Sequence, residues 1–226
     1  MELAIDTSTR YASIALARQG QVVWEESWRS EQNHTVELMP AVEGLLKKAH
    51  ASVKNLTGIA VAQGPGHFSA LRVGLSLAKG LAAGLGVPIV GVNTLLLEAF
   101  PYLGLGMSVY ALLDAGRGDV AWAAFPDGQG TLQDPGVRVT DLEVLWGHIH
   151  PPALLCGEGI SQRLEELVER RQAGVYLVTA SPPTRRAGVL ASLGARRLLQ
   201  GQADDLATLQ PIYLRGPSIS APRAAS

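Results

Sequence analysis

A glycine-rich turn at residues 64–66 is the segment whose residue types most directly suggest chemistry. Gly64 and Gly66 flank Pro65, and a helix rich in small residues is expected to follow from about Ser69. Backbone N–H groups converge where such a turn opens a helix, so an anion could bind there. The same segment could instead position the helix for docking to another protein. The residue types at this turn therefore leave two interpretations open, an anion site and a docking surface.

The histidines do not follow a known metal-binding pattern. They lie at positions 34, 50, 67, 148 and 150, and neither H-E-x-x-H nor H-x-x-x-H occurs. We expect His148 and His150 to be surface residues because no nearby carboxylate completes a ligand set, and His34 is more typical of a helix start. A hydrolase would also need a G-x-S-x-G elbow, which is missing. The sequence therefore predicts no metal site and no catalytic residues.

Composition narrows the class of protein. The 226 residues carry a formal net charge of -1 and no long basic run, so the chain alone is not expected to bind a polyanion tightly. The single cysteine, Cys156, excludes an internal disulfide and is expected to be a small core residue in a cytoplasmic protein. The apolar run at 81–100 is interrupted by glycines and a proline, which predicts no membrane span there.

Hydrophobic periodicity predicts strands and helices that position the turn. Apolar runs predict strands at 3–7, 11–17, from residue 22, at 56–63 and at 88–93. Asn33 is a candidate cap for a helix over 34–50, in which Pro40 predicts a kink or a later start. Further helices are expected at 69–85 and 184–200.

The pattern repeats in the second half of the chain. Residues 109–125 resemble residues 3–17, and residues 153–171 parallel the strand, Gly-x-Gly turn and helix of residues 59–80. A duplicated α/β unit explains both similarities. The expected domains are 1–104 and 105–226, with the helix at 184–200 able to pack back on the first domain.

Five motifs of the sequence are informative in combination. They are "AIDTST" at 4–9, "HT" at 34–35, "GPGHFSALRVGLSLAKGLA" at 64–82, "VNTL" at 92–95 and "PIYLR" at 211–215. Together these motifs resemble the TsaB family, also called YeaZ. The resemblance is dense over residues 1–97 and thin after 126. It implies a duplicated α/β fold of the actin/Hsp70/ribonuclease H-like type, with a mixed sheet flanked by helices in each domain. Three positions depart from the usual G-P-G-S-F-T-G of the family, namely His67, Ser69 and Ala70.

The resemblance also raises the question of nucleotide binding, because actin-like ATPases hold phosphates with an Asp-x-Gly turn in each half. Here the first turn ends in serine, whose Cβ would keep the backbone away from a phosphate and so disfavours tight ATP binding. The competing interpretation is that the first aspartate bonds its own turn as an Asx motif. A weak ATP or ADP site would comprise Asp6, Thr7, Ser8, Gly64, Gly66 and Asp114.

The helix expected at 69–85 carries two rows of small residues, which suggest close approach of another helix. One row is Ala70, Gly74, Ala78 and Ala82, and the other is Ser76, Gly80 and Gly84. In the resembling family this helix and the preceding one bind the catalytic homologue TsaD or form homodimers. The partner interface implied here comprises Leu38, Val42, Leu45, Ala70, Gly74 and Ala78.

The resemblance implies a non-catalytic scaffold for transfer of a threonylcarbamoyl group from its adenylate to the adenosine next to a tRNA anticodon. The expected partners are TsaD and the ATPase TsaE, with tRNA contacted only through the complex. The alternative is an actin-fold ATP-dependent phosphotransferase of a small substrate. That activity would need a catalytic base, for which the candidates are Asp6, Asp114 and Asp119.

Overall fold

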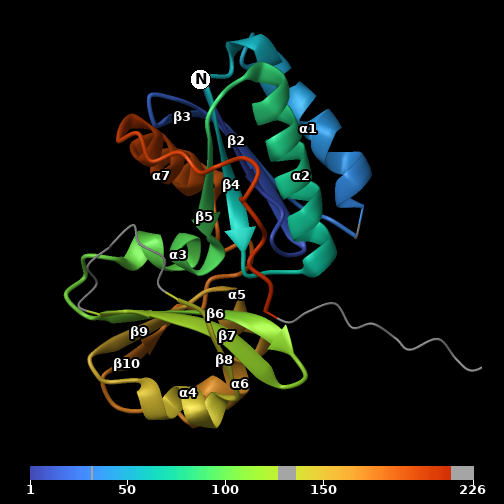
Figure 1. Ribbon diagram of the computed structural model, residues 1–226. Coiled ribbons are helices and arrows are strands. Elements are labelled where there is room, and N and C mark those ends of the chain that lie inside the picture. Colours follow the sequence, from blue (N-terminus) through green and yellow to red (C-terminus); the bar gives the residue numbers. More distant parts are fainter. Residues whose placement is uncertain (32, 127–135, 215–226) are drawn as a thin grey trace, which may run out of the picture.

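The computed structural model describes residues 1–31, 33–126 and 136–214, and Figure 1 shows two sheets placed one above the other. The first sheet has the order β3-β2-β1-β4-β5, and the second β10-β9-β6-β7-β8. The first is built from β1 (Glu2–Asp6), β2 (Tyr11–Arg18), β3 (Gln21–Arg29), β4 (Gly58–Gly64) and β5 (Ile89–Asn93). The second is built from β6 (Ser108–Gly116), β7 (Asp119–Phe125), β8 (Arg138–Thr140), β9 (Ala153–Cys156) and β10 (Val175–Leu177).

The two sheets share one topology. In the first, β1 pairs antiparallel with β2 and parallel with β4, and in the second β6 pairs antiparallel with β7 and parallel with β9. Each half thus contains a hairpin followed by parallel strands on its other side. This repetition confirms the predicted duplicated α/β fold with a mixed sheet in each half.

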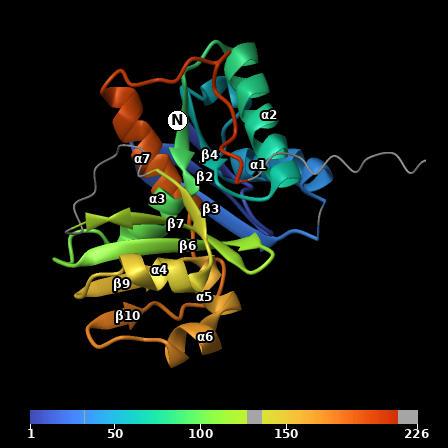
Figure 2. The ribbon, with the colours of Figure 1, turned by 60° about the horizontal axis from the view of Figure 1, so that its bottom comes forward.

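Helices cover both faces of the first sheet. Figure 2 shows α1 and α2 on one side of it and α7 on the other. The long helices are α1 (His34–Lys48), α2 (Phe68–Leu85) and α7 (Ala187–Leu199). The shorter ones are η1 (Val53–Asn55), α3 (Thr94–Ala99), η2 (Phe100–Tyr102), α4 (Leu142–His148), α5 (Glu158–Gln162) and α6 (Leu164–Glu169).

Strand alternation divides the interior into layers. On β1, Leu3 and Ile5 face the core under α1 and α2, whereas Ala4 faces the opposite layer. That opposite layer also receives Val109 of β6 and Leu190 of α7, so residues from both halves of the chain pack into one continuous core. Because α7 contacts β1, β2 and β4, the chain returns to the first sheet after building the second.

The observed elements differ from the predicted ones in three places. Helix α1 begins at His34 and runs through Pro40, so the later start that Pro40 suggested does not occur. The single helix expected before residue 171 is split into α5 and α6 at Arg163, whose φ of -130 is not helical. Helices α3 and α4 were not predicted because each is only one to two turns long.

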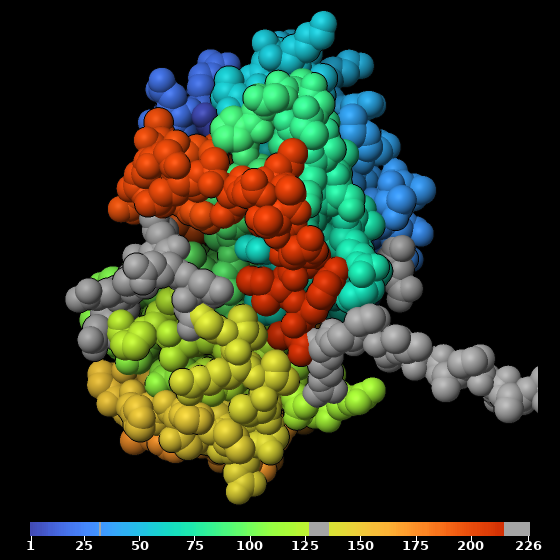
Figure 3. Space-filling view, in the orientation of Figure 1, coloured from blue at the N-terminus to red at the C-terminus, as the bar shows by residue number. Residues whose placement is uncertain are grey.

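After α7, residues 202–214 form a segment, which we call the C-terminal strap, that lies along α2 (Figure 3). Lys79 donates to the carbonyl oxygen of Leu209 at 3.0 Å, and Arg72 Nε donates to the hydroxyl of Tyr213 at 2.8 Å. In the "PIYLR" motif, Arg215 lies outside the described residues. Helix α2 is long and apolar enough to cross a membrane, but the core helix of a soluble protein can have the same length and composition. In this structure 33% of the residues of α2 are buried.

Candidate functional site

The turn after β1 is held by its own side chains. Asp6 Oδ1 accepts hydrogen bonds from the Ser8 backbone N–H at 2.8 Å and from the Ser8 hydroxyl at 2.5 Å. This geometry confirms the predicted Asx motif. Thr7 donates from its hydroxyl to the carbonyl oxygen of Ala70 at 2.6 Å, which ties the turn to the start of α2. One Asp6 oxygen is therefore already engaged within the turn.

The other Asp6 oxygen binds a buried arginine from the segment before α7. Arg185 Nε lies 2.9 Å from Asp6 Oδ2, and Arg185 Nη1 lies 2.7 Å from Glu98 and 2.9 Å from Glu158. Arg185 Nη2 also donates to Thr9 at 2.8 Å. This arginine cluster joins β1 of the first half to α3 and to α5 of the second half.

Charge balance explains how these ions tolerate burial. Burial opposes the charge of Arg185, but the carboxylates of Asp6, Glu158 and Glu98 hold its pKa above the ordinary value. Burial raises the pKa of Glu98, partly offset by Arg185 and by a hydrogen bond from Thr184. Glu98 Oε2 has no hydrogen-bond partner within the described part of the chain. The arginine supplies the positive charge that faces Asp6.

The glycines of the candidate nucleotide site serve close packing. A Cβ on Gly66 would collide with the carbonyl oxygen of Ser8, and one on Gly64 would lie 2.5 Å from the carbonyl oxygen of Ile212. The second predicted aspartate, Asp114, is a third exposed and lies 3.8 Å from Arg163 Nη2. The structure thus brings the turn after β1 into contact with Gly66. Asp114 instead forms its salt bridge with Arg163, a residue of the second half.

The residues predicted to form a partner interface are buried in the chain's own core. The side chains of Leu38, Val42 and Leu45 are at most 1% exposed. On α2, a Cβ at Gly74 would collide with the Thr7 hydroxyl. The prediction that these side chains form a surface is therefore wrong, because the small-residue row faces the sheet. The buried members of the predicted set are Leu38, Val42, Leu45, Ala70, Gly74 and Ala78.

A different face of α1 and α2 is open. Val36 is 69% exposed, and a groove of about 350 Å³ runs between the helices beside Met39, Val73 and Leu77. The second row of small residues lies on this exposed side, where a Cβ at Gly80 or Gly84 would meet nothing within 4 Å. The open face of α1 and α2 is therefore partly apolar and has low relief.

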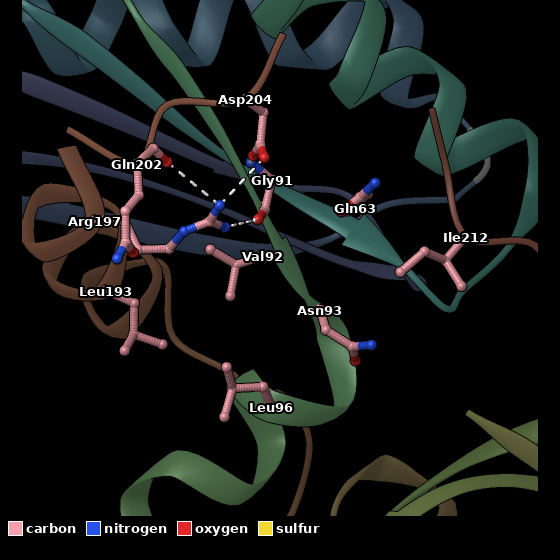
Figure 4. A pocket seen from close by; sticks show the side chains of 10 residues that line it. All are labelled: Gln63, Gly91, Val92, Asn93, Leu96, Leu193, Arg197, Gln202, Asp204 and Ile212. Atoms are coloured by element: carbon pink, nitrogen blue, oxygen red, sulfur yellow. Dashed lines mark hydrogen bonds and ion pairs between the residues drawn. The ribbon is translucent and has the colours of Figure 1, made fainter. Parts of the chain in front are cut away.

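Another hollow, of about 460 Å³, lies between α7, β5 and the C-terminal strap (Figure 4). Its polar groups bond one another: Arg197 donates to the carbonyl oxygen of Gly91 at 2.6 Å, and Asp204 accepts from the Gly91 N–H at 2.7 Å. Leu96 and Leu193 supply apolar lining. These bonds attach the strap to β5.

Sequence reasoning missed the residues that organise the domain junction. Arg185, Glu98 and Glu158 come from three distant segments, and nothing in their local spacing signals that they meet. Two other predictions are confirmed. His148 and His150 are exposed, as expected for surface residues, and Cys156 is buried, as expected for a core residue. Among the described residues, no group of three or more His, Cys, Asp or Glu is placed to hold a metal ion.

The duplicated sheets and paired hairpin turns define a protein of the actin/Hsp70-like ATPase fold. The activator of 2-hydroxyisocaproyl-CoA dehydratase from Clostridium difficile, solved with bound ADPNP, shares this fold with a TM-score of 0.50 and 8% identity, covering 90% of this chain and 98% of that chain. YeaZ from Pseudomonas aeruginosa is more similar, with a TM-score of 0.76, 27% identity, and coverage of 94% of this chain and 99% of that chain.

The sequence comparisons narrow the class to one family. The family model described as TsaD, tRNA N6-adenosine threonylcarbamoyltransferase, matches residues 14–147. The tRNA threonylcarbamoyladenosine biosynthesis protein TsaB of Bacillus subtilis is 32% identical over 94% of this chain and 93% of its own length. The chain belongs to the TsaB family.

Proposed function

We propose that this chain takes part in threonylcarbamoyladenosine formation on tRNA as a non-catalytic scaffold subunit that binds TsaD. TsaD would transfer the threonylcarbamoyl group from threonylcarbamoyl-AMP to the adenosine next to the anticodon. Membership of the TsaB family supports the pathway. The observation that carries the scaffold role is the open face of α1 and α2, which exposes Val36 and has a groove lined by the apolar side chains of Met39, Val73 and Leu77.

The turn after β1, at the position where actin-like ATPases hold phosphate, supports a non-catalytic role. Both Asp6 oxygens are engaged, one by Ser8 and the other by Arg185. A Mg-nucleotide at this turn would have to displace a buried ion pair, which is unfavourable because it leaves Arg185 without one of its carboxylates. We therefore propose that Asp6 is structural and that any ATP or ADP binding is weak.

The remaining partners of the proposed assembly are the ATPase TsaE and a second copy of this chain when TsaD is missing. The near-neutral chain has little capacity for counterion release, so tRNA would be contacted through the complex. This scaffold would act in the cytoplasm.

The proposed docking face is tested by Val36→Asp. Placing a charge in an apolar interface is expected to weaken binding to TsaD roughly tenfold or more while leaving the melting temperature near that of the unmodified chain. Val144→Asp is the matched control because Val144 is an exposed valine, 46% accessible, on a helix of the second half. Affinity should be measured by calorimetric titration, and tRNA modification by TsaD with each variant should follow the affinities. Equal affinity of the two variants for TsaD would contradict docking by this face.

A further inference from the structure

A pocket of about 420 Å³ is lined by residues at the start of α1 and of α2. Figure 1 shows that α2 begins at the end of the first sheet that faces the second half. We call this cavity the histidine pocket, and the residues that matter for its chemistry are Thr9, Arg10, His34, Thr35, His67 and Ser69. It adjoins the arginine cluster at Thr9, whose hydroxyl oxygen accepts from Arg185 Nη2 at 2.8 Å.

Both helix starts leave donors facing this pocket. Helices α1 and α2 are 15 and 18 residues long, and neither Asn33 nor His67 caps its helix with a side-chain hydrogen bond. The first N–H groups of an α-helix have no acceptor within the helix, and the N-terminal end of the dipole favours negative charge. Thr35 and Ser69 of these first turns line the pocket. Two long helices therefore direct the positive ends of their dipoles at one cavity.

A buried histidine points independently to a missing ligand. His34 lines the pocket and is 7% exposed, yet its Nδ1 has no hydrogen-bond partner among the residues that the structure describes. A buried polar atom without a partner costs free energy unless a water or ligand satisfies it. The ring therefore keeps a polar group available beside the two helix starts.

The local charge also suits an anion. Arg10 is exposed and has no ion-pair partner within the described part of the chain. The acids that influence the histidines already have partners: Asp6 and Glu158 bind Arg185, Asp114 binds Arg163, and Glu37 accepts from the Trp28 indole. Among the described residues, the pocket thus combines a cation without an ion-pair partner with acids that are already held in ion pairs or, for Glu37, by a hydrogen bond.

We propose that the histidine pocket binds a phosphate-type oxyanion, as inorganic phosphate or as the phosphate group of a small phosphoester. The helix N–H groups would hold its oxygens, and Arg10 would supply the countercharge. His67 and His34, which also line the pocket, would complete the donor set. This inference does not depend on the proposed function, because it needs no partner protein.

The test is a calorimetric titration of the full chain with sodium phosphate at constant ionic strength. We expect saturable binding that Arg10→Gln weakens roughly tenfold or more, because a charge-assisted contact is lost. Arg18→Gln is the matched control, since Arg18 is an exposed arginine at the other end of β2, and it should leave the affinity unchanged. His67→Ser should also weaken binding while preserving the melting temperature. No saturable binding, or equal affinity in Arg10→Gln and Arg18→Gln, would overturn the proposal.

Titrations with two further ligands, glycerol phosphate and acetate, identify the chemical class of the bound anion. Glycerol phosphate binding more tightly than inorganic phosphate would assign a phosphoester, and the reverse order would assign free phosphate; both results support the site. Acetate binding as tightly as phosphate would overturn the assignment to a tetrahedral oxyanion. As a spectroscopic check, phosphate should raise the pKa of His67 in an NMR titration, since burial lowers that pKa in the ligand-free chain.

Discussion

At the scale of single residues, the arginine cluster determines how the two halves meet. Arg185 is 2% exposed and contacts carboxylates of Asp6, Glu98 and Glu158. Removing one partner from a buried ion pair typically costs about 3–5 kcal/mol because the other charge is left uncompensated. The carboxylates are not equivalent, however, since Glu98 alone among them carries a buried oxygen without a partner.

The stability of the Glu98→Gln variant, measured relative to that of the unmodified chain, should therefore increase as pH rises. Burial raises the pKa of Glu98 in the folded state, so stability contributed by its protonated form is present at low pH and is lost as pH rises through that pKa. Glutamine imitates the neutral form at every pH. The difference in melting temperature between the variant and the unmodified chain should increase from about pH 4 to about pH 8.

Glu169→Gln, an exposed glutamate on α6, is the control for this pH series and should show no such trend. If Glu98→Gln instead lost stability relative to the unmodified chain as pH rose, the ionised carboxylate would be the form that the fold requires.

At the scale of elements, the two small-residue rows of α2 have opposite roles. Gly74 packs on Thr7, so Gly74→Ala should lower the free energy of unfolding by about 1–3 kcal/mol through overpacking. Gly80 has open space around its would-be Cβ, so Gly80→Ala should raise that free energy by up to about 1 kcal/mol through helix propensity. Urea unfolding of both variants gives the comparison, and similar effects at the two positions would contradict the assigned faces.

The long periodic elements could be predicted from the sequence, whereas the faces of the helices could not. Apolar runs predicted β1 and β4, alternation predicted β2, and the glycine-rich turn before a segment rich in small residues predicted α2. Small residues recur at helical spacing whether they face a sheet or a partner, so Gly74 was assigned to the wrong side. Arg185 was missed because its partners come from other segments, with Glu98 87 and Asp6 179 residues away in the chain, and local pattern carries no information about such contacts.

At the scale of the whole molecule, one core spans both sheets, and this predicts a single unfolding transition. Ala4, Val109 and Leu190 belong to the same buried cluster although they come from the first sheet, the second sheet and α7. Calorimetric and van't Hoff enthalpies should therefore agree. Leu190→Ala should destabilise the entire transition by about 2–5 kcal/mol. Two separable transitions, with only one affected by Leu190→Ala, would show that the halves unfold independently.

The attachment of the C-terminal strap to β5 has a consequence for solubility. β5 is the outermost strand on its side of the first sheet, and an uncovered edge strand can pair with a strand of another molecule. Here Asp204 donates its N–H to the carbonyl oxygen of Ile89 at 2.9 Å and accepts from the N–H of Gly91, while Arg197 occupies the Gly91 carbonyl oxygen. The backbone groups of Ile89 and Gly91 that could template intermolecular strand addition are thus already bonded, which protects this part of β5 against edge-to-edge aggregation.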